Sequence, residues 1–307
     1  MINQKEQKKS DPKNRMAADI NVKKQSYVTV IESKAAIFRI DFIELWRYRY
    51  LIWLYIYRDF VVLYKQTVLG MIWWLLQPFL TTIIFTIVFG IIIKINTNEI
   101  PALLFYLSGI TLWNYFLYCF LHISQSFIDN RELLKKVYFP RLVIPIAAII
   151  SNLMRLALQL LLLVFLYLFF ILRGAEICPS IFILGFPLLL FYVALLAFGF
   201  GILTASLTIK YRDIILALPF FTQLWMYVSA VLFPFSLVPE KWQFWFSLNP
   251  ILPAIEMFRY MCFSSDSSSN FSISFESILV NIIVTILFLL IGIFVFNQVE
   301  QTFTDII

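Results

Sequence analysis

The chain has 307 residues, of which 61% are hydrophobic and only 14% are charged. This composition excludes an ordinary water-soluble globular protein and is typical of a chain that crosses the membrane several times. The net charge of +6 does not indicate nucleic-acid binding, because 13 of the 24 Lys and Arg precede Gly70, as expected of a membrane orientation signal.

Residues 1–36 include the run KEQKKSDPKNR and have few large apolar side chains. Such a segment buries too little apolar surface to fold, and it lacks the apolar core of a secretory signal peptide. We therefore expect a disordered cytoplasmic tail over 1–36, followed by one transmembrane domain over 37–307.

The segment 41–64 predicts an amphipathic helix. Its charged side chains gather on one side of a helical wheel, with Lys65 continuing that side: Asp41, Glu44, Arg47, Arg58 and Asp59. The opposite side is apolar and aromatic: Phe42, Trp46, Tyr50, Trp53, Ile56, Tyr57, Phe60, Val61 and Tyr64. A basic, aromatic-rich helix that leads into a span is expected to lie flat in the headgroup layer. It either only anchors the protein, or it also offers Arg47, Arg58 and Lys65 to anionic headgroups or to an anionic lipid-linked substrate.

Six apolar runs are long enough, at about 1.5 Å per residue, to cross a hydrocarbon layer about 30 Å thick. They lie at about 71–93, 102–123, 145–172, 181–209, 214–233 and 278–296. With both termini in the cytoplasm, 19 Lys and Arg fall in cytoplasmic segments, which favours an even number of spans. The expected fold is an all-α polytopic membrane protein with six transmembrane helices and an amino-terminal interfacial helix.

Between the second and third spans, residues 129–142 (DNRELLKKVYFPRL) are polar and basic, which places them on the cytoplasmic side. Pro140 ends any helix near Phe139. We expect a short helix beneath the membrane, with Val137, Tyr138 and Phe139 as an exposed apolar knob.

Arg155 lies within the third span, where an arginine is costly in hydrocarbon. Its side chain either extends back to the near interface, or it faces the bundle interior and lines a route for an anionic group.

After the fifth run, prolines interrupt the stretch PFSLVPEKWQFWFSLNPILPAIEMFRY. Its apolar pieces are too short to span and are typical of re-entrant or interfacial helices. We therefore expect re-entrant helices between spans five and six.

The sequence contains no arrangement of residues typical of an enzyme. Cys119, Cys178 and Cys262 have neither metal-ligand nor disulfide spacing, and His122 is the only histidine. A phosphate-binding G-x-x-x-x-G-K-[ST] loop is also missing. We expect no metal, no cofactor, no catalytic site and no bound ATP in this chain.

Four stretches, in this order, resemble the permease subunits of ATP-binding-cassette exporters for polysaccharides, which include O-antigen, capsule and teichoic acid exporters. They are RDFVVLYKQTVLGMIWWLLQPF (58–79), NRELLKKVYFPRLVIP (130–145), KYRDI (210–214) and FPFSLVPEKWQFWFSLNPILPAIEMFR (233–259). The resemblance covers the chain from about residue 45 to the last span.

The resemblance implies a permease of the bacterial inner membrane that forms a homodimer and recruits two copies of a separate ATPase, which binds ATP and Mg. The implied substrate is a lipid-diphosphate-linked polysaccharide, such as the O-antigen of lipopolysaccharide. The implied ATPase-coupling residues are Asn130, Arg131, Lys135, Lys136, Tyr138, Phe139, Arg141, Lys210, Arg212 and Asp213. Residues 234–259, called the gate segment below, would form the outer gate, with Pro234, Pro239, Trp242, Trp245, Pro250 and Pro253.

The chain departs from the family pattern at one point. Where related permeases often have Ser-Pro-Val in the fifth span, this chain has Ser229, Ala230 and Val231. The resemblance therefore does not predict the local kink or the gate geometry.

A channel for a sugar polymer needs flat apolar faces and hydrogen-bonding groups, with few charges. The residues that supply these types are Trp113, Asn114, Tyr115, Phe116, Tyr118, Trp225 and Tyr227. Trp and Tyr are also enriched in the interfacial belts of membrane proteins, so a belt position is the alternative for each of them.

Other functions stay open at this point. An exporter of small drugs or lipids would lack the patterns at 58–70 and 139–143, and an ATP-independent flippase should have roughly double the number of spans. A polytopic glycosyltransferase should show acidic catalytic residues on a loop, whereas the outer acids here are dispersed: Glu99, Glu176, Glu240, Glu256, Asp266 and Glu276. A structural or receptor protein is a further alternative.

Overall fold

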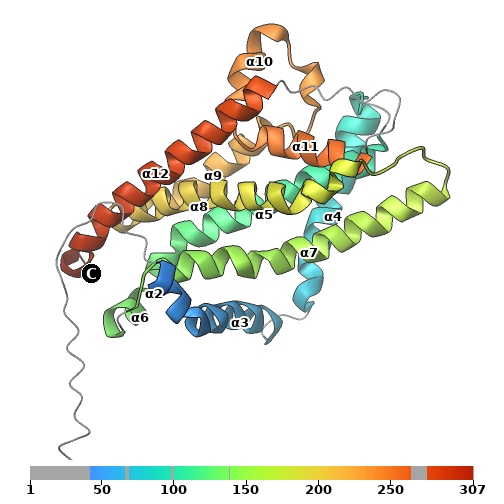
Figure 1. Ribbon diagram of the computed structural model, residues 1–307. Coiled ribbons are helices and arrows are strands. Elements are labelled where there is room, and N and C mark those ends of the chain that lie inside the picture. The colour runs from blue at the N-terminus through green and yellow to red at the C-terminus, as the bar shows by residue number, and fades with distance from the viewer. Residues whose placement is uncertain (1–41, 66–68, 98–99, 138, 264–274, 307) are drawn as a thin grey trace, which may run out of the picture. The chain divides into compact units, whose positions relative to one another are not determined.

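The computed structural model describes residues 42–65, 69–97, 100–137, 139–263 and 275–306. By internal contacts the chain separates into Met1–Ala36 and Ile37–Ile307, and every described residue belongs to the second unit. The tail expected over 1–36 and the coupling residue Tyr138 thus lie outside the described residues. Within the described ranges the regular structure is helical, with no strand (Figure 1).

The amino-terminal helices are α2 (Phe42–Arg47) and α3 (Arg49–Lys65). Helix α3 packs along α7 (Val143–Leu172). The contact belongs to a cluster of buried apolar residues from α2, α3, α7 and the segment just before α7: Leu45, Tyr55, Phe139, Val143, Ile144 and Ala147. The opposite face of α3 exposes Tyr50, Trp53, Leu54 and Tyr57. A helix with one buried and one exposed apolar face is suited to lie between protein and lipid.

The next membrane-length helix, Gly70–Ile92, is built from three pieces. They are a 3₁₀ turn η2 (Gly70–Ile72), the α-helix α4 (Trp73–Phe85) and a π-helical stretch η3 (Thr86–Ile92). Pro78 lies inside α4 and lacks the N–H that would bond to the carbonyl four residues back. The hydroxyl of Thr82 donates to the Pro78 carbonyl at 2.7 Å. This first span is therefore the least regular of the long helices.

Helix α5 (Ala102–Asp129) forms the interior of the bundle. In its most apolar stretch 78% of the residues are buried, against 11 to 28% in the other four membrane-length helices. It packs against α7 on one side and α8 (Phe186–Lys210) on another, and α8 is preceded by the 3₁₀ turn η4 (Ile181–Gly185). The other long helices keep an apolar face outward.

Helices α8 and α12 (Phe275–Ile306) approach closely at two glycines. A Cβ atom added to Gly199 would lie 2.9 Å from the Leu289 nitrogen, and one added to Gly292 would lie 2.7 Å from the Gly199 carbonyl oxygen. Small residues at these positions allow the two backbones to touch, as in many membrane helix pairs.

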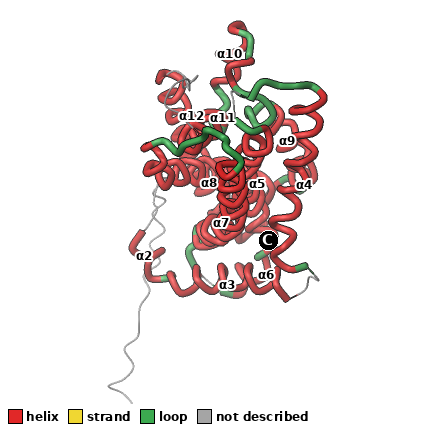
Figure 2. Tube along the Cα trace, turned by 90° about the vertical axis from the view of Figure 1, so that its right-hand side faces the viewer, coloured by secondary structure: helices red, strands yellow, loops and turns green. Residues whose placement is uncertain are grey.

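In the part of the chain that the structure describes, five helices are long and apolar enough to cross a membrane: Gly70–Ile92, Ala102–Asp129, Val143–Leu172, Ile181–Lys210 and Glu276–Val299. The fifth expected span, 214–233, differs, because its helix α9 (Asp213–Tyr227) has 15 residues and ends six residues early. The gate segment that follows contains η5 (Phe235–Leu237), α10 (Glu240–Ser247) and α11 (Leu252–Phe263). Figure 2 shows several loop segments gathered at the end of the bundle where α10 and α11 lie.

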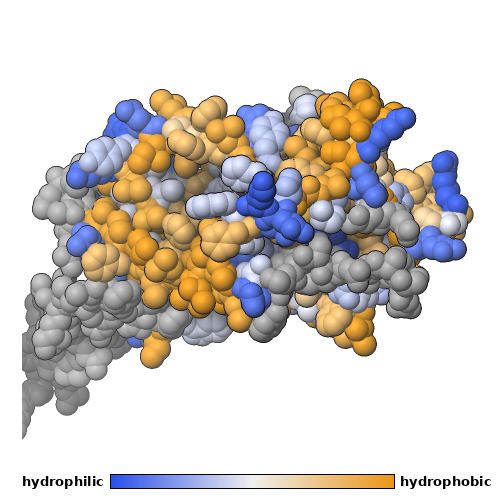
Figure 3. All heavy atoms as spheres, turned by 90° about the horizontal axis from the view of Figure 1, so that it is seen from above, coloured by the Kyte–Doolittle hydropathy of each residue, from blue (hydrophilic) through white to orange (hydrophobic). Residues whose placement is uncertain are grey.

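The bundle exposes much apolar surface. On α7 the side chains of Leu161, Phe165, Leu168 and Leu172 point outward. Figure 3 shows hydrophobic side chains over much of one face of the molecule, with hydrophilic groups scattered between them. Exposed apolar area on this scale requires lipid or another chain to cover it.

Candidate functional site

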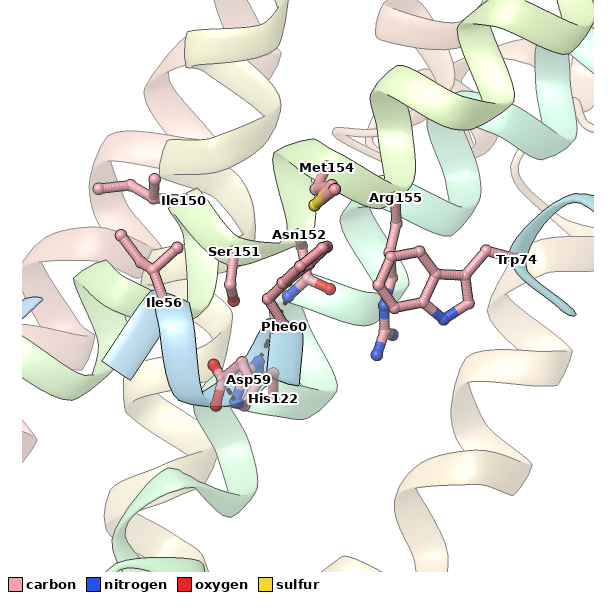
Figure 4. A pocket seen from close by; sticks show the side chains of 10 residues that line it. All are labelled: Ile56, Asp59, Phe60, Trp74, His122, Ile150, Ser151, Asn152, Met154 and Arg155. Atoms are coloured by element: carbon pink, nitrogen blue, oxygen red, sulfur yellow. Dashed lines mark hydrogen bonds and ion pairs between the residues drawn. The ribbon is translucent and has the colours of Figure 1, made fainter. Parts of the chain in front are cut away.

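A small cavity of about 60 Å³ lies where α3, α4, α5 and α7 meet, and it has room for a few water molecules. Its lining combines apolar and charged side chains: Ile56, Asp59, Phe60, Trp74, His122, Ile150, Ser151, Asn152, Met154 and Arg155 (Figure 4). The polar members come from three different helices, so the fold, and not local sequence, brings them together.

Asp59 on α3, His122 on α5 and Asn152 on α7 form a chain of polar contacts. His122 Nε2 lies 3.6 Å from Asp59 Oδ2, and Asn152 Nδ2 lies 3.4 Å from His122 Nδ1. Because an amide nitrogen only donates, His122 Nδ1 acts as the acceptor and its Nε2–H faces the carboxylate. Figure 4 shows Asp59 and His122 pointing toward one another. The three side chains tie α3 to α5 and α7.

Arg155 lies on α7 at the other end of the cavity. Its guanidinium lies over two aromatic rings, 4.9 Å from the Trp74 centroid and 4.8 Å from the Tyr118 centroid. Among the described residues no carboxylate forms an ion pair with it. Stacking of this kind stabilises the charge while the N–H groups in the ring plane can still donate. Arg155 therefore packs against Trp74 and Tyr118.

The Arg58 side chain extends from α3 toward the end of α5. Its Nη1 donates to Asn130 Oδ1 at 2.7 Å, while Nε and Nη2 donate to Asp59 Oδ1 at 3.2 and 3.0 Å. The same guanidinium lies 4.6 Å from the centroid of the Tyr55 ring. Burial raises the pKa of the Tyr55 phenol, so this ring stays neutral beside the arginine. Arg47 and Lys65, the other basic residues expected at this site, are exposed.

Two groups of expected ATPase-coupling residues lie at one end of the bundle. Lys135 and Lys136 are exposed on α6 (Arg131–Lys136), and Lys210, Arg212 and Asp213 are exposed at the turn between α8 and α9. The hydroxyl of Thr208 donates to the Ser124 carbonyl at 3.0 Å and so holds the end of α8 to that of α5. Arg131 and Arg141 are partly buried and Asn130 is buried.

Phe139 is placed differently from the expected exposed knob. Its side chain is 4% exposed, and its ring centroid lies 6.3 Å from that of Tyr55 on α3. Val137 is exposed as expected. Phe139 turns inward because Tyr55 on α3 gives its ring an apolar neighbour. The local sequence around Pro140 does not reveal this neighbour, because Tyr55 lies far away in the chain.

The aromatic residues expected to line a channel are mostly packed inside the chain. Trp113, Tyr115 and Phe116 are buried. The Trp225 ring lies 6.2 Å from Trp113 and 5.1 Å from Phe116, between centroids. Tyr118 and Trp225 are partly buried, and Tyr227 is exposed. Within one chain, Tyr227 is therefore the most exposed of these aromatic residues, and Tyr118 and Trp225 are exposed only in part.

The gate segment is held to the bundle by side-chain amides. Trp225 Nε1 donates to Asn249 Oδ1 at 2.9 Å, and Asn249 Nδ2 donates to the Val228 carbonyl at 3.1 Å and to Ser229 Oγ at 2.9 Å. From α12, Asn281 Nδ2 donates to the Ser247 carbonyl at 2.7 Å. Of the expected gate residues, Pro239, Trp242 and Trp245 are exposed, while Pro234, Pro250 and Pro253 are buried.

Arg259 on α11 is a central residue that the sequence reading gave no role. Its side chain is 3% exposed, and its Nη1 donates to the Ala230 carbonyl at 2.7 Å and to Glu256 Oε1 at 3.1 Å. Its Nη2 donates to the carbonyls of Val231 at 3.0 Å and Phe105 at 3.3 Å. A Cβ atom at Gly109 would lie 2.6 Å from Nη2, so this glycine leaves room for the guanidinium. Arg259 thus satisfies backbone carbonyls that the end of α9 leaves without helical partners.

The break after α9 has a left-handed residue. Ala230 has φ of 54°, a region that costs an L-residue with a side chain about 1–2 kcal/mol. Proline is locked near φ of about −65° and cannot adopt it. The departure from the Ser-Pro-Val pattern therefore coincides with a backbone conformation that a proline at 230 would forbid.

We expect Ala230→Gly to change the free energy of unfolding by less than about 1 kcal/mol, because relief of the left-handed strain offsets the lost methyl group. Ala230→Pro should cost more than about 3 kcal/mol, because the ring excludes the positive φ. Thermal unfolding of the detergent-solubilised chain measures both. A proline variant as stable as the glycine variant would contradict this backbone geometry.

We expect Arg259→Met to destabilise the chain by about 3–5 kcal/mol, because it leaves Glu256 and several carbonyls buried without their donor. The matched control is Arg155→Met, which removes an arginine from stacking contacts and should cost about 1–2 kcal/mol. Unfolding in the same detergent compares the two. Equal losses would show that Arg259 has no special part in holding the break.

Residues 50–263 match the family model described as ABC-2 type transporter. The chain is 26% identical over 256 residues to an O-antigen export system permease protein RfbA of Klebsiella pneumoniae, covering 81% of this chain and 92% of the relative. It is 24% identical over 218 residues to the protein of the same name in Myxococcus xanthus, covering 70% and 81%. The family match spans more than half of the chain and includes α3, the polar cavity, α6 and the gate segment, so the chain belongs to the ABC-2 type transporter family.

Proposed function

We propose that this chain is the membrane-spanning permease subunit of an ABC exporter that moves a lipid-linked polysaccharide of the O-antigen type across the bacterial inner membrane. ATP hydrolysis takes place in a separate ATPase subunit. The single observation that carries the proposal is the match to an O-antigen export system permease protein over 92% of that protein's length.

The arrangement of the chain supports a subunit that receives its energy from a partner. Two exposed basic segments, α6 and the turn between α8 and α9, lie at one end of the bundle and offer an ATPase a positively charged docking face. Among the described residues no group of three or more His, Cys, Asp and Glu could hold a metal. We place both termini and these segments in the cytoplasm, with α9 as the fifth of six crossings and the gate segment on the outer side.

The substrate would approach along α3. Arg155 lines the polar cavity, and Arg58 lies beside it, bonded to Asp59. Arg47 on α2 and Lys65 on α3 are exposed. Arginine suits phosphate oxygens because its planar fork donates two parallel hydrogen bonds. We assign these four residues to the diphosphate of the lipid carrier. A homodimer would place the exposed Tyr227 and the gate segment around a shared path for the polymer.

The test is the fate of the polymer in a strain that lacks this chain. We expect polysaccharide to vanish from the cell surface while lipid-linked polymer accumulates inside, and expression of the chain should restore surface display. Loss of a glycosyltransferase would instead leave no polymer in either place. Loss of a small-molecule exporter would leave surface polysaccharide unchanged and alter drug sensitivity. Either of these results would overturn the proposal.

Lys135→Glu combined with Lys136→Glu should reduce recovery of the ATPase with a tagged permease on the order of tenfold, because it reverses the charge of the proposed docking face. Membrane insertion should not change, since both side chains are exposed. Co-purification from membranes measures the effect.

The matched control is Lys94→Glu combined with Lys241→Glu, which reverses two exposed lysines that the topology places on the outer side. ATPase recovery with this control should equal that of the unaltered chain. If both double variants recover the ATPase equally well, α6 is not the docking element.

A further inference from the structure

Asn130 lies at the junction of α5 and α6, and its side chain is used in an unusual way. An Asn that precedes a helix normally accepts a hydrogen bond from a backbone N–H of the first turn. Here no side-chain cap of this kind is made to α6. Instead Asn130 Nδ2 donates to the Ser126 carbonyl at 2.8 Å, and Oδ1 accepts from Arg58 Nη1 at 2.7 Å. The residue that starts α6 is therefore fixed by α3.

This hydrogen bond joins two segments that are 72 positions apart in the chain. Asn130 is 6% exposed, whereas the Arg58 side chain is 43% exposed. One end of the contact thus lies inside the bundle next to α6, and the other end faces the surroundings of α3. A group that binds Arg58 from outside has direct access to the atom that holds Asn130.

Arg58 can exchange its partners. Three of its five N–H groups are engaged by Asp59 and Asn130, and a phosphate group would accept two parallel hydrogen bonds from the same fork. If the guanidinium turns toward a phosphate, Asp59 keeps its contact with His122. Asn130 would then lose the charged donor of its Oδ1. The exchange therefore removes a hydrogen bond from Asn130, the residue that starts α6.

We propose that the hydrogen bond between Arg58 and Asn130 is a relay that reports occupancy of the lipid-diphosphate site on α3 to the ATPase-coupling helix α6. The relay rests on the proposed function, because that function supplies both the diphosphate ligand and the docking role of α6. With the site empty, Arg58 holds the start of α6. With a diphosphate bound, Arg58 turns to the ligand and α6 is released.

Hydrogen–deuterium exchange of the full-length chain in nanodiscs of phosphatidylethanolamine and phosphatidylglycerol tests the relay. Amides of 49–65 report ligand binding on α3, and amides of 131–137 report the state of α6. A polyprenyl diphosphate should slow exchange over 49–65 and speed exchange over 131–137 by about three- to tenfold in the unaltered chain.

Arg58→Gln should speed exchange over 131–137 by about tenfold without ligand, and the polyprenyl diphosphate should add nothing further. Asn130→Asp keeps the acceptor oxygen and should retain the slow exchange, whereas Asn130→Leu should match Arg58→Gln. Arg49→Gln is the matched control on α3, since the exposed Arg49 is not assigned to the diphosphate site and donates to the Trp46 carbonyl instead of to α5. Its α6 exchange without ligand should stay unchanged.

The outcomes separate the relay from the function on which it rests. If 49–65 does not respond to the diphosphate, the assigned substrate site is wrong. If 49–65 responds but 131–137 does not, or if Arg58→Gln and Arg49→Gln alter α6 equally, the relay is overturned while the export function can still stand. Recovery with Asn130→Asp but not with Asn130→Leu supports the relay over a general loss of folding.

Discussion

The burial of α5 is the constraint on which the rest of the structure depends. A helix that is surrounded by protein cannot turn a charged or unpaired group toward lipid, so its polar contacts must come from neighbouring helices. At one end the Phe105 carbonyl accepts from Arg259 on α11, and at the other His122 and Asn130 contact α3. The gate segment and α3 are therefore both attached to the same central helix, at opposite ends.

Small hydroxyl side chains make the apolar interior compatible with these polar contacts. The hydroxyls of Ser124 and Thr208 each donate to a carbonyl of an earlier turn of their own helix, and Thr208 also donates across to Ser124. Thr82 does the same beside Pro78. Each group is satisfied without a charge, which suits a bundle whose outer surface must face hydrocarbon.

The sequence was sufficient where the pattern is local. Long apolar runs predicted the helices that became α5, α7, α8 and α12, and clustered prolines predicted short helices after α9. It failed where a contact spans a large sequence distance. The end of α9 at Tyr227 depends on Asn249 and Arg259, the inward turn of Phe139 depends on Tyr55, and the partner of His122 is Asp59, 63 positions earlier. In the sequence, a single histidine and an arginine within an aromatic run carry no sign of such partners.

The close approach of α8 and α12 has a mechanical consequence. At Gly199 and Gly292 the two helices meet backbone to backbone, in a space that a Cβ atom would overfill. Sliding one helix along the other would bring residues that carry a Cβ atom into this space, so this pair should behave as one rigid body. Any change of shape during a transport cycle must then be absorbed elsewhere: by the π-helical end of the first span and by the interrupted backbone that follows α9.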